Sequence, residues 1–380
     1  MSNSAKKEYL QEIRKRYFLA GRSDKTLMLD EFCSVCNLNR KYVIRLIRKK
    51  ETVGLSKKGR HKKYYSVALL EFLKDLWVVT NLACSKRLKA AIPLWLPYYH
   101  SLSNNPLSDE DKKLLLEISP RTIDRLLHRL KSKYMKLGLS TTKPGSLLKK
   151  QVPIKVNQWD ESRPGFIEAD TVAHCGSSLS GQFVYTLNIV DIASGWTEQR
   201  ALWGKGQRGV FEALKNITEL LPFKVRGFDC DNGGELLNYM LLEYFTHRKN
   251  PVQYTRSREY RKNDNAHIEE KNWTHVRQFI GYQRFDKLET VDMLNDLYLT
   301  EWRLYLNFFI PSFKLIDKKR DGSKIIKTFD PPKTPYQRLL DSTSIKSAKK
   351  KELSQIFKSL DPYKLEKIMK SKIKNILKIY

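Results

Sequence analysis

The amino-acid sequence predicts an α/β fold, in which a mixed five-stranded sheet with flanking helices is preceded by all-α units and followed by a basic, mostly helical tail. Three strand-like segments follow one another through short turns, which is typical of an antiparallel meander. Two further short strands each come after an amphipathic helix, and such a crossover favours parallel pairing. The predicted strands are residues 165–174, 183–192, 196–203, 224–229 and 252–255.

Helical periodicity and composition predict the rest of the chain. Helices are expected at 207–221, 235–245, 265–279 and 282–309. Near the end of the chain we expect a short strand at 324–329, a rigid proline-rich segment at 331–336, and two basic amphipathic helices within 345–380. We expect these two helices to bind DNA or a partner subunit; binding to a membrane surface is a poorly supported alternative. The predicted domains are 1–63, 64–137, a linker at 138–164, a core at 165–310, and a basic region at 311–380.

The charge of the chain indicates a polyanionic partner. The formal net charge is +30, and hydrophobic residues, at 41%, are sufficient for sizeable cores. Residues 1–160 carry 34 Lys and Arg against 14 Asp and Glu, and residues 311–380 carry 19 against 7. The middle segment, residues 161–310, carries 18 Lys and Arg against 20 Asp and Glu. A slightly acidic centre between basic flanks favours nucleic acid as the partner, with a merely soluble basic protein as the alternative.

Cysteine usage and hydropathy indicate the cellular compartment in which we expect the protein. Five scattered cysteines argue against a disulfide framework and for a reducing environment. Cys33 and Cys36 have the spacing of one of the two ligand pairs of a zinc site, but no second Cys or His pair follows at a fitting distance. We therefore expect both cysteines to pack between helices. The sequence has no apolar run of about 18 residues and no signal-peptide core. We therefore expect a cytoplasmic protein, associated with the nucleoid when bound to DNA, with no membrane partner.

Two segments have the pattern of a helix-turn-helix. In the first, helices at 4–20, 27–36 and 41–50 are separated by Gly21 and by a turn with a capping residue at 37–39. In the second, within 64–137, Ser119 would cap a helix whose first residue is Pro120. For each of the two segments, the alternative to DNA binding is a helical unit that serves only to pack. The basic residues available to DNA are Arg40, Lys41, Arg45 and Arg48, Arg60 in the linker 54–63, and Arg121 and Arg125.

Three carboxylate-bearing patches lie at 165–171, 227–235 and 261–271. Acidic residues on two strand ends and one helix can converge on a divalent metal. Hard oxygen ligands suit Mg²⁺, which leaves coordination positions for phosphate oxygens. Two such ions can activate a nucleophile and stabilise the leaving oxygen of a phosphodiester. The patches therefore predict a metal-dependent phosphoryl-transfer site.

The predicted element order is that of an RNase H-like fold, and over about 165–310 the chain resembles the integrase and DDE-transposase superfamily. The motifs that carry the resemblance are the Asp170 strand, the turn Asp231-Asn232-Gly233-Gly234-Glu235, and Asn265-Ala266-His267-Ile268-Glu269. Insertion-sequence transposases of this superfamily usually have flanking helix-turn-helix units as well. Retroviral-type integrases are more distant, because their amino-terminal zinc ligands are not apparent here.

The resemblance implies that Asp170, Asp231 and Glu269 are the catalytic carboxylates and the ligands of two Mg²⁺ ions, with Mn²⁺ as a substitute. Each has a neighbouring rival: Glu168, Asp229 and Glu270 respectively. Glu270 would point about 100° away from Glu269 on a helix. Asp191, at the end of the second strand, fits a structural role better than a catalytic one.

Around the third acid the chain both fits and departs from the family pattern. Arg258, Arg261 and Lys262 precede it and could hold target phosphates. Ala266 stands where the familiar motif has Gly. Relatives often place basic residues one or two turns after the Glu, where this chain has Trp273 and Val276. These departures concern DNA-end contact rather than the metal site.

The activity implied by the resemblance is that of a transposase or integrase. Such an enzyme binds double-stranded DNA at element terminal repeats, frees a 3′-OH, and joins it to target DNA without a protein nucleophile. It would work as a homo-oligomer and take no small-molecule substrate. The alternatives are an RNase H-fold nuclease that cuts without joining, and an inactive helix-turn-helix regulator.

Overall fold

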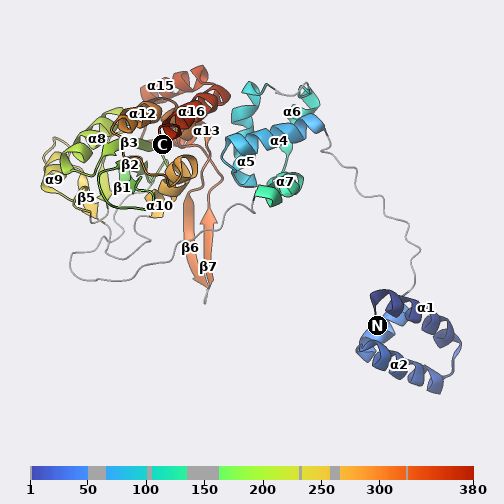
Figure 1. The fold of residues 1–380 in the computed structure, drawn as a ribbon. Coiled ribbons are helices and arrows are strands. Elements are labelled where there is room, and N and C mark those ends of the chain that lie inside the picture. Colours follow the sequence, from blue (N-terminus) through green and yellow to red (C-terminus); the bar gives the residue numbers. More distant parts are fainter. Residues whose placement is uncertain are drawn as a thin grey trace. The chain divides into compact units, whose positions relative to one another are not determined.

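The computed structural model describes residues 2–49, 66–100, 105–134, 162–230, 233–256, 266–321 and 324–380. The chain divides into two compact units, Met1–Lys63 and Tyr64–Tyr380 (Figure 1). No helix in the described ranges is long and apolar enough to cross a membrane.

The first unit consists of three helices around a small core. They are α1 (Asn3–Leu19), α2 (Arg22–Cys36) and α3 (Arg40–Arg48). The side chains at its centre are almost fully buried: Ile13, Phe32, Val43 and Ile47. Between α2 and α3, Asn37 has a left-handed φ of 51°, and the Asn39 side chain accepts a hydrogen bond from the Lys41 backbone N–H. The predicted turn with a capping residue is confirmed.

The start of α2 was predicted wrongly. The sequence predicted that this helix begins at residue 27 and that Gly21 ends the preceding helix. Instead α2 begins at Arg22, and Gly21 is its N-cap with an ordinary φ of −71°. Residues 22–26 have no buried side chain, so hydrophobic periodicity carries no signal there. Cys36 is buried in the core and Cys33 packs against it, as expected for packing cysteines.

The second unit opens with a helical region. Its elements are α4 (Val67–Val79), α5 (Ser85–Trp95), η1 (Leu96–Tyr98), α6 (Asp109–Glu117) and α7 (Pro120–Tyr134). Ser119 accepts a hydrogen bond from the Thr122 N–H and so caps α7, as predicted. Pro93 lies inside α5. The helix continues because Trp95, two residues later, is fully buried, and this burial outweighs the single backbone hydrogen bond that a proline removes.

The predicted five-stranded sheet is present. Its strands are β1 (Phe166–Ala173), β2 (Val184–Asp191), β3 (Thr197–Trp203), β4 (Gly227–Cys230) and β5 (Gln253–Arg256). The strand order is β3-β2-β1-β4-β5. β1 pairs antiparallel with β2, and β2 with β3, whereas β4 is parallel to both β1 and β5. This order and these directions make the fold RNase H-like, and β1 is its central strand.

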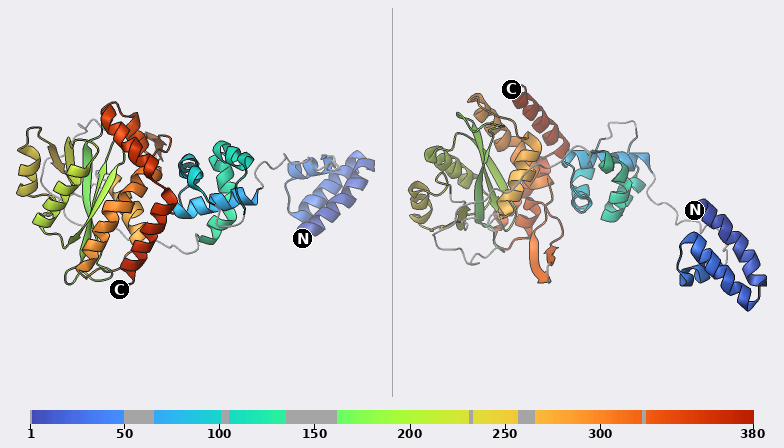
Figure 2. Two further views of the ribbon diagram at one scale, coloured as in Figure 1. Left: turned by 90° about the horizontal axis from the view of Figure 1, so that it is seen from above. Right: turned by 60° about the horizontal axis from the view of Figure 1, so that its bottom comes forward.

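Helices cover both faces of the sheet, as Figure 2 shows: α8 and α9 lie on one side and α12 and α13 on the other. They are α8 (Gln207–Leu220), α9 (Tyr239–Thr246), α10 (Ala266–Lys271), η3 (Asn272–Arg277), α11 (Gln278–Ile280), α12 (Glu289–Leu297), η4 (Tyr298–Trp302) and α13 (Arg303–Phe309). The helix expected over 265–279 is one run of α10, η3 and α11, in which η3 is a π-helical turn. The helix expected from 282 begins at Glu289, because residues before it pair with the β1–β2 connection at Cys175 and Arg284.

The C-terminal part packs on the same unit. It consists of β6 (Leu315–Asp321), β7 (Lys324–Phe329), α14 (Pro335–Asp341), α15 (Ser347–Ser359) and α16 (Pro362–Leu377). The predicted strand at 324–329 and the two final helices are confirmed. β6, its antiparallel partner, was not predicted. The segment expected to be extended to residue 336 ends at Thr334, which forms a capping box with Gln337 and starts α14.

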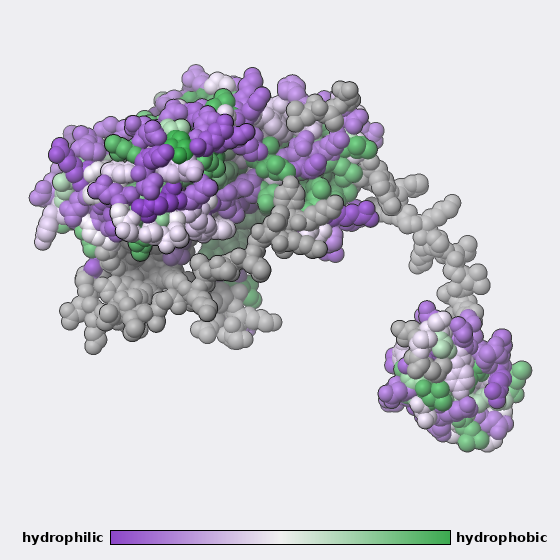
Figure 3. Space-filling view, viewed as in Figure 1, coloured by the Kyte–Doolittle hydropathy of each residue, from purple (hydrophilic) through white to green (hydrophobic). Residues whose placement is uncertain are grey.

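One hydrophobic core runs through the second unit and includes side chains from α4 to α16. Trp95 on α5 joins the helical region to the rest, since its indole N–H donates to the Phe309 carbonyl at 3.0 Å. Its ring also meets those of Tyr305, Phe309 and Tyr363 edge to face. In Figure 3 hydrophilic side chains cover most of the visible face of this unit, as expected when the apolar residues are gathered inside.

Candidate active site

Asp170 occupies the central strand β1, and two donors orient its half-buried carboxylate. The Thr171 backbone N–H donates to Oδ1 at 2.7 Å. The side-chain amide of Asn272, on η3, donates to Oδ2 at 2.7 Å. These two hydrogen bonds orient the Asp170 carboxylate between the central strand and the helical run that carries the third predicted acid.

A row of buried amides supports this arrangement. Asn188 on β2 is the Cα partner of Asp170, and Gln199 on β3 is the partner of Asn188. The Asn188 amide donates to Asn272 Oδ1 at 2.8 Å, and the Gln199 amide donates to Asn188 Oδ1 at 2.8 Å. Polar side chains in an apolar interior cost free energy unless their hydrogen bonds are made. The row therefore fixes the Asn272 amide, which in turn fixes the Asp170 carboxylate.

Glu168, the rival of Asp170, has a different role. Its side chain is only 2% exposed. Its Oε2 accepts a hydrogen bond from the Ile268 backbone N–H at 3.0 Å, in the first turn of α10. A carboxylate at the positive end of a helix is favourable. Glu168 thus attaches the start of α10 to β1, which is a structural function next to the predicted site.

The second predicted acid, Asp231, lies outside the described residues. It directly follows Cys230, the last residue of β4, whose Cα partner is Ala169 beside Asp170. Its rival Asp229 is buried in β4 and accepts a hydrogen bond from the Thr255 hydroxyl of β5. That contact joins the two parallel strands, so Asp229 is part of the sheet interior.

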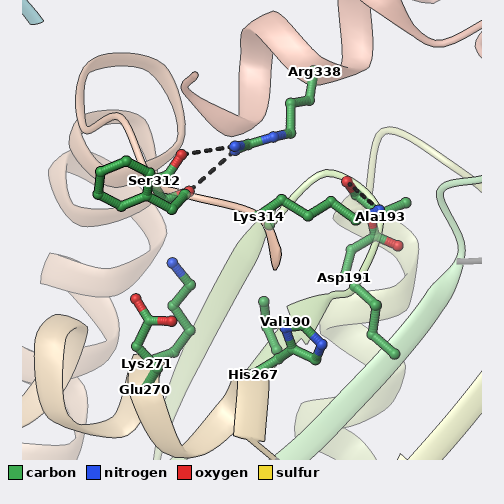
Figure 4. A pocket seen from close by; sticks show the side chains of 12 residues that line it. Val190, Asp191, Ala193, His267, Glu270, Lys271, Ser312, Lys314 and Arg338 are labelled. Atoms are coloured by element: carbon green, nitrogen blue, oxygen red, sulfur yellow. Dashed lines mark hydrogen bonds between the residues drawn. The ribbon is translucent and has the colours of Figure 1, made fainter. Parts of the chain in front are cut away.

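Glu269 and Glu270, the two candidates for the third acid, are both exposed on α10. Glu269 precedes Asn272 by three residues, and this spacing places two side chains on the same side of a helix. Glu270 instead lines a small pocket with His267 and Lys271, against the end of β2 (Figure 4). The side of the helix that faces Asp170 is therefore the side of Glu269.

The pocket beside Glu270 contains two buried ionisable groups. Burial lowers the pKa of Lys271 to about 8, although Glu270 opposes the shift. Burial also raises the pKa of Asp191 to about 6. Asp191 Oδ1 accepts from the Gly165 N–H at 2.7 Å, and its Oδ2 accepts from the Ser194 N–H at 2.8 Å. These contacts tie the ends of β1 and β2 together, as expected of a structural residue.

The predicted ligands fit a hard cation in chemistry. Asp170, Asp231 and Glu269 offer only carboxylate oxygens, and the oxygens of Asp170 are already oriented by neutral donors. Among the residues that the structure describes, no group of three or more His, Cys, Asp or Glu side chains is close enough to hold a metal ion. Since Asp231 is outside those ranges, the geometry of the complete triad stays a prediction.

The basic residues predicted to contact DNA fall into three groups. Lys41, Arg45 and Arg48 are exposed on α3, whereas Arg40 pairs with Asp30. On α7, Arg121 and Arg125 are exposed. Four predicted contacts lie outside the described ranges: Arg60, Arg258, Arg261 and Lys262. The exposed residues of α3 and α7 are accessible to a polyanion, but no described contact brings them to the carboxylates.

Comparison with known proteins gives one close relative. No protein-family model matches the chain. It is 36% identical over 344 residues to the uncharacterized protein y4rM of Sinorhizobium fredii (strain NBRC 101917 / NGR234), covering 89% of this chain and 96% of that protein. The chain belongs to the y4rM family. Among solved structures, the HTLV-2 integrase catalytic core domain in complex with magnesium matches 39% of this chain and 90% of that domain, with 15% identity and a TM-score of 0.29.

For this member of the y4rM family, sequence reasoning missed the residues that support Asp170. They are Asn272, Asn188 and Gln199. A signal was present, because Asn188 stands inside the apolar run of residues 183–192 and Asn272 follows Glu269 by three residues. A buried polar side chain in a strand needs a partner. That requirement could have identified Asn188 as a residue that faces a functional group.

Proposed function

We propose that this chain is a DNA transposase or integrase, which binds element ends and catalyses metal-dependent 3′-end cleavage and strand transfer through Asp170, Asp231 and Glu269. The observation that carries the proposal is the hydrogen bond from Asn272 to Asp170. It joins the helical run of Glu269 to the central strand of an RNase H-like sheet. The resemblance of the three sequence motifs to the DDE superfamily supports the same assignment.

Asp170, Asp231 and Glu269 would hold Mg²⁺, two ions in each active site, with Mn²⁺ as a substitute. When bound, the metal supplies Lewis-acid activation of the attacking oxygen and neutralises charge at the phosphate. The chain itself contributes orientation. Asn272 and Thr171 each hold one oxygen of Asp170, so the carboxylate does not have to reorganise when its ligand arrives. Glu168 keeps the start of α10, the helix that carries Glu269, on β1.

The partner in this proposal is double-stranded DNA, as element terminal repeats and as target. The net charge of +30 supports a polyanion. Exposed arginines on α3 and α7 are available for phosphate contacts. The enzyme would act as a homo-oligomer that brings two ends together, in the cytoplasm on nucleoid DNA.

Strand transfer in vitro tests the proposal. Oligonucleotides taken from inverted repeats that flank the reading frame are offered with a plasmid target and Mg²⁺ or Mn²⁺. We expect joined products from the wild type and none from Asp170→Asn or Glu269→Gln, with end binding retained in both. Glu270→Gln is the matched control, because this neighbouring carboxylate lines a different pocket, and it should retain activity.

The same assay separates the alternatives. Nicking without joined products would favour a nuclease that does not join. End binding without cutting in either metal, with verified ends, would overturn the enzymatic proposal and leave a DNA-binding regulator. If Glu270→Gln lost joining and Glu269→Gln kept it, Glu270 would be the third catalytic carboxylate instead of Glu269.

A further inference from the structure

Two large aromatic side chains are exposed beside the candidate site. Trp273 on η3 is 49% exposed and Tyr282, just after α11, is 60% exposed. Their ring centroids are 6.3 Å apart and their planes are inclined at 45°. Exposed aromatic surface costs free energy in water, and a paired patch of it typically marks a binding site. We call these two residues the aromatic pair.

Trp273 of the aromatic pair is close in sequence to residues of the candidate site. Trp273 directly follows Asn272, whose amide holds Asp170. It also follows Glu269 by four residues, a spacing that keeps side chains on one side of a helix. Trp273 therefore lies on the helical run that carries the third predicted acid, next to the group that orients the first, and Tyr282 follows the end of that run.

A cation links the aromatic pair to the end of β1. The guanidinium of Arg277 lies 4.7 Å from the centroid of the Tyr282 ring. It also donates to the Ala173 carbonyl at 2.6 Å. Ala173 is three residues beyond Asp170 on the strand, which corresponds to about 10 Å. A nucleotide attached to a phosphate at Asp170 could therefore reach this surface.

The backbone holds the aromatic pair in place. Asn272–Arg277 is a π-helical turn, a feature that is often found at functional sites. Gly281 ends the run with φ 83° and ψ −157°, a conformation open to glycine alone, and so turns the chain at Tyr282. These are two special backbone conformations in ten residues, on either side of the segment that joins Trp273 to Tyr282.

We propose that the aromatic pair stacks on an unpaired base of the DNA end, next to the phosphate that is cut, with Arg277 as a cation beside the stack. This inference rests on the proposed function. Stacking on aromatic rings is available to every base, because each has a π face. A cation next to the rings and a chain of net charge +30 favour nucleic acid over an apolar protein partner. The pair would then favour separation of the terminal base pair at the site.

Binding of 2-aminopurine-labelled ends to the full-length protein, without divalent metal, tests the inference. We compare fully paired ends with ends whose last two base pairs are mismatched. For the wild type we expect quenched 2-aminopurine fluorescence and a preference for mismatched ends. Trp273→Ala should lose the quenching and weaken binding to mismatched ends about 10- to 100-fold. Trp273→Phe should retain most of both effects, and Tyr282→Ala should be intermediate.

Controls keep this result separate from the proposed function. Phe18→Ala removes another exposed aromatic ring (59% exposed, on α1) and should leave quenching unchanged. Binding is measured without turnover, so the two proposals can fail separately. If the wild type quenches 2-aminopurine fluorescence but performs no strand transfer, the stacking inference is retained and only the proposed function is overturned. Unchanged quenching in Trp273→Ala would overturn the inference. A change of oligomeric state in Trp273→Ala, seen by sedimentation, would also overturn it, since the pair would then be a contact between copies.

Discussion

Asn272 Nδ2 lies 2.7 Å from Asp170 Oδ2, across 102 residues of sequence. Neither side chain is placed by its own segment alone: β1 presents the carboxylate, and the π-helical turn after α10 presents the amide. The contact therefore depends on the packing of that helical run against the sheet. If Asp170 binds metal, this amide determines which of its oxygens is available.

The first prediction concerns this amide. Asn272→Ala should reduce cleavage at limiting Mg²⁺ by about 10- to 100-fold, because residues that orient metal ligands typically have effects of that size. The loss should shrink as Mg²⁺ is raised, since the ligands themselves remain. A Mg²⁺ titration of end cleavage measures both effects.

Thr274→Ala is the control for Asn272→Ala. Thr274 is in the same helical run, and its hydroxyl donates to the Glu270 carbonyl one turn back, so its removal leaves the Asp170 contact intact. An Asn272→Ala enzyme with wild-type Mg²⁺ dependence would show that the amide has no part in metal binding. Asn272→Ala should also lower the free energy of unfolding by about 1 to 3 kcal/mol, because it removes two hydrogen bonds and leaves the buried Asn188 amide without its acceptor.

The second prediction concerns the basic face of α3. Arg45→Ala and Arg48→Ala should each lower the slope of log affinity for DNA against log salt by about 1, because each arginine that contacts a phosphate releases about one counterion. Arg40→Ala should have a smaller effect, since Arg40 already pairs with Asp30. Affinities from 50 to 300 mM KCl give the slopes, and Arg22→Ala, an exposed arginine on α2, is the control. Slopes equal to that of the wild type in all four variants would exclude α3 from the DNA contact.

Much of the fold could be predicted because its signals are local. The alternation in 165–203 identified three strands, and Asn39 and Ser119 identified helix starts. β6 was missed because five of its seven residues, Asp317 to Asp321, are charged. Its strand structure depends on pairing with β7. The start of α12 was misplaced for a similar reason, since the bridge between Cys175 and Arg284 holds the preceding residues.

The same distinction applies to the candidate site. Asp170 and Glu269 belong to short motifs that can be recognised in one segment. The choice between Glu269 and Glu270 gained support from Asn272, whose orientation depends on β1, and from the pocket that Glu270 lines. Asn188 and Gln199 meet across two strands, and no pattern in either strand predicts the other. Catalytic motifs are thus local in sequence, whereas the residues that hold them are set by tertiary packing.

The third prediction is a pH dependence of stability. The folded-state pKa of Asp191 is raised from 3.8 to about 6 by burial. The folded state therefore binds a proton more tightly than the unfolded state, so this group's contribution is present below about pH 4 and is lost as pH rises through 6. The lost contribution is about 3 kcal/mol. Asn at this position does not titrate, so the stability gap between wild type and Asp191→Asn should narrow by about that amount from pH 4 to pH 7.

Urea unfolding of both proteins at several pH values measures this gap. Asp191→Asn should be the less stable protein throughout, because an Asn NH₂ cannot accept the hydrogen bonds that the Gly165 and Ser194 N–H groups donate. Asp292→Asn, a change at an exposed carboxylate on α12, is the control. A gap that stays constant from pH 4 to pH 7 would contradict the assignment of this titration to Asp191.

The last prediction concerns Trp95, which joins α5 to α13. The indole is fully buried, donates to the Phe309 carbonyl, and meets the rings of Tyr305 and Tyr363. Trp95→Ala should lower the free energy of unfolding by about 3 to 5 kcal/mol, the typical cost of such a truncation in a core. The helical region 66–134 should then unfold before the sheet, and calorimetry with limited proteolysis would detect a separate early transition. Leu116→Ala, at an exposed position on α6, should keep the wild-type transition. A single transition at the wild-type temperature in Trp95→Ala would mean that the helical region does not depend on this contact, and that its attachment is spread over the rest of the shared core.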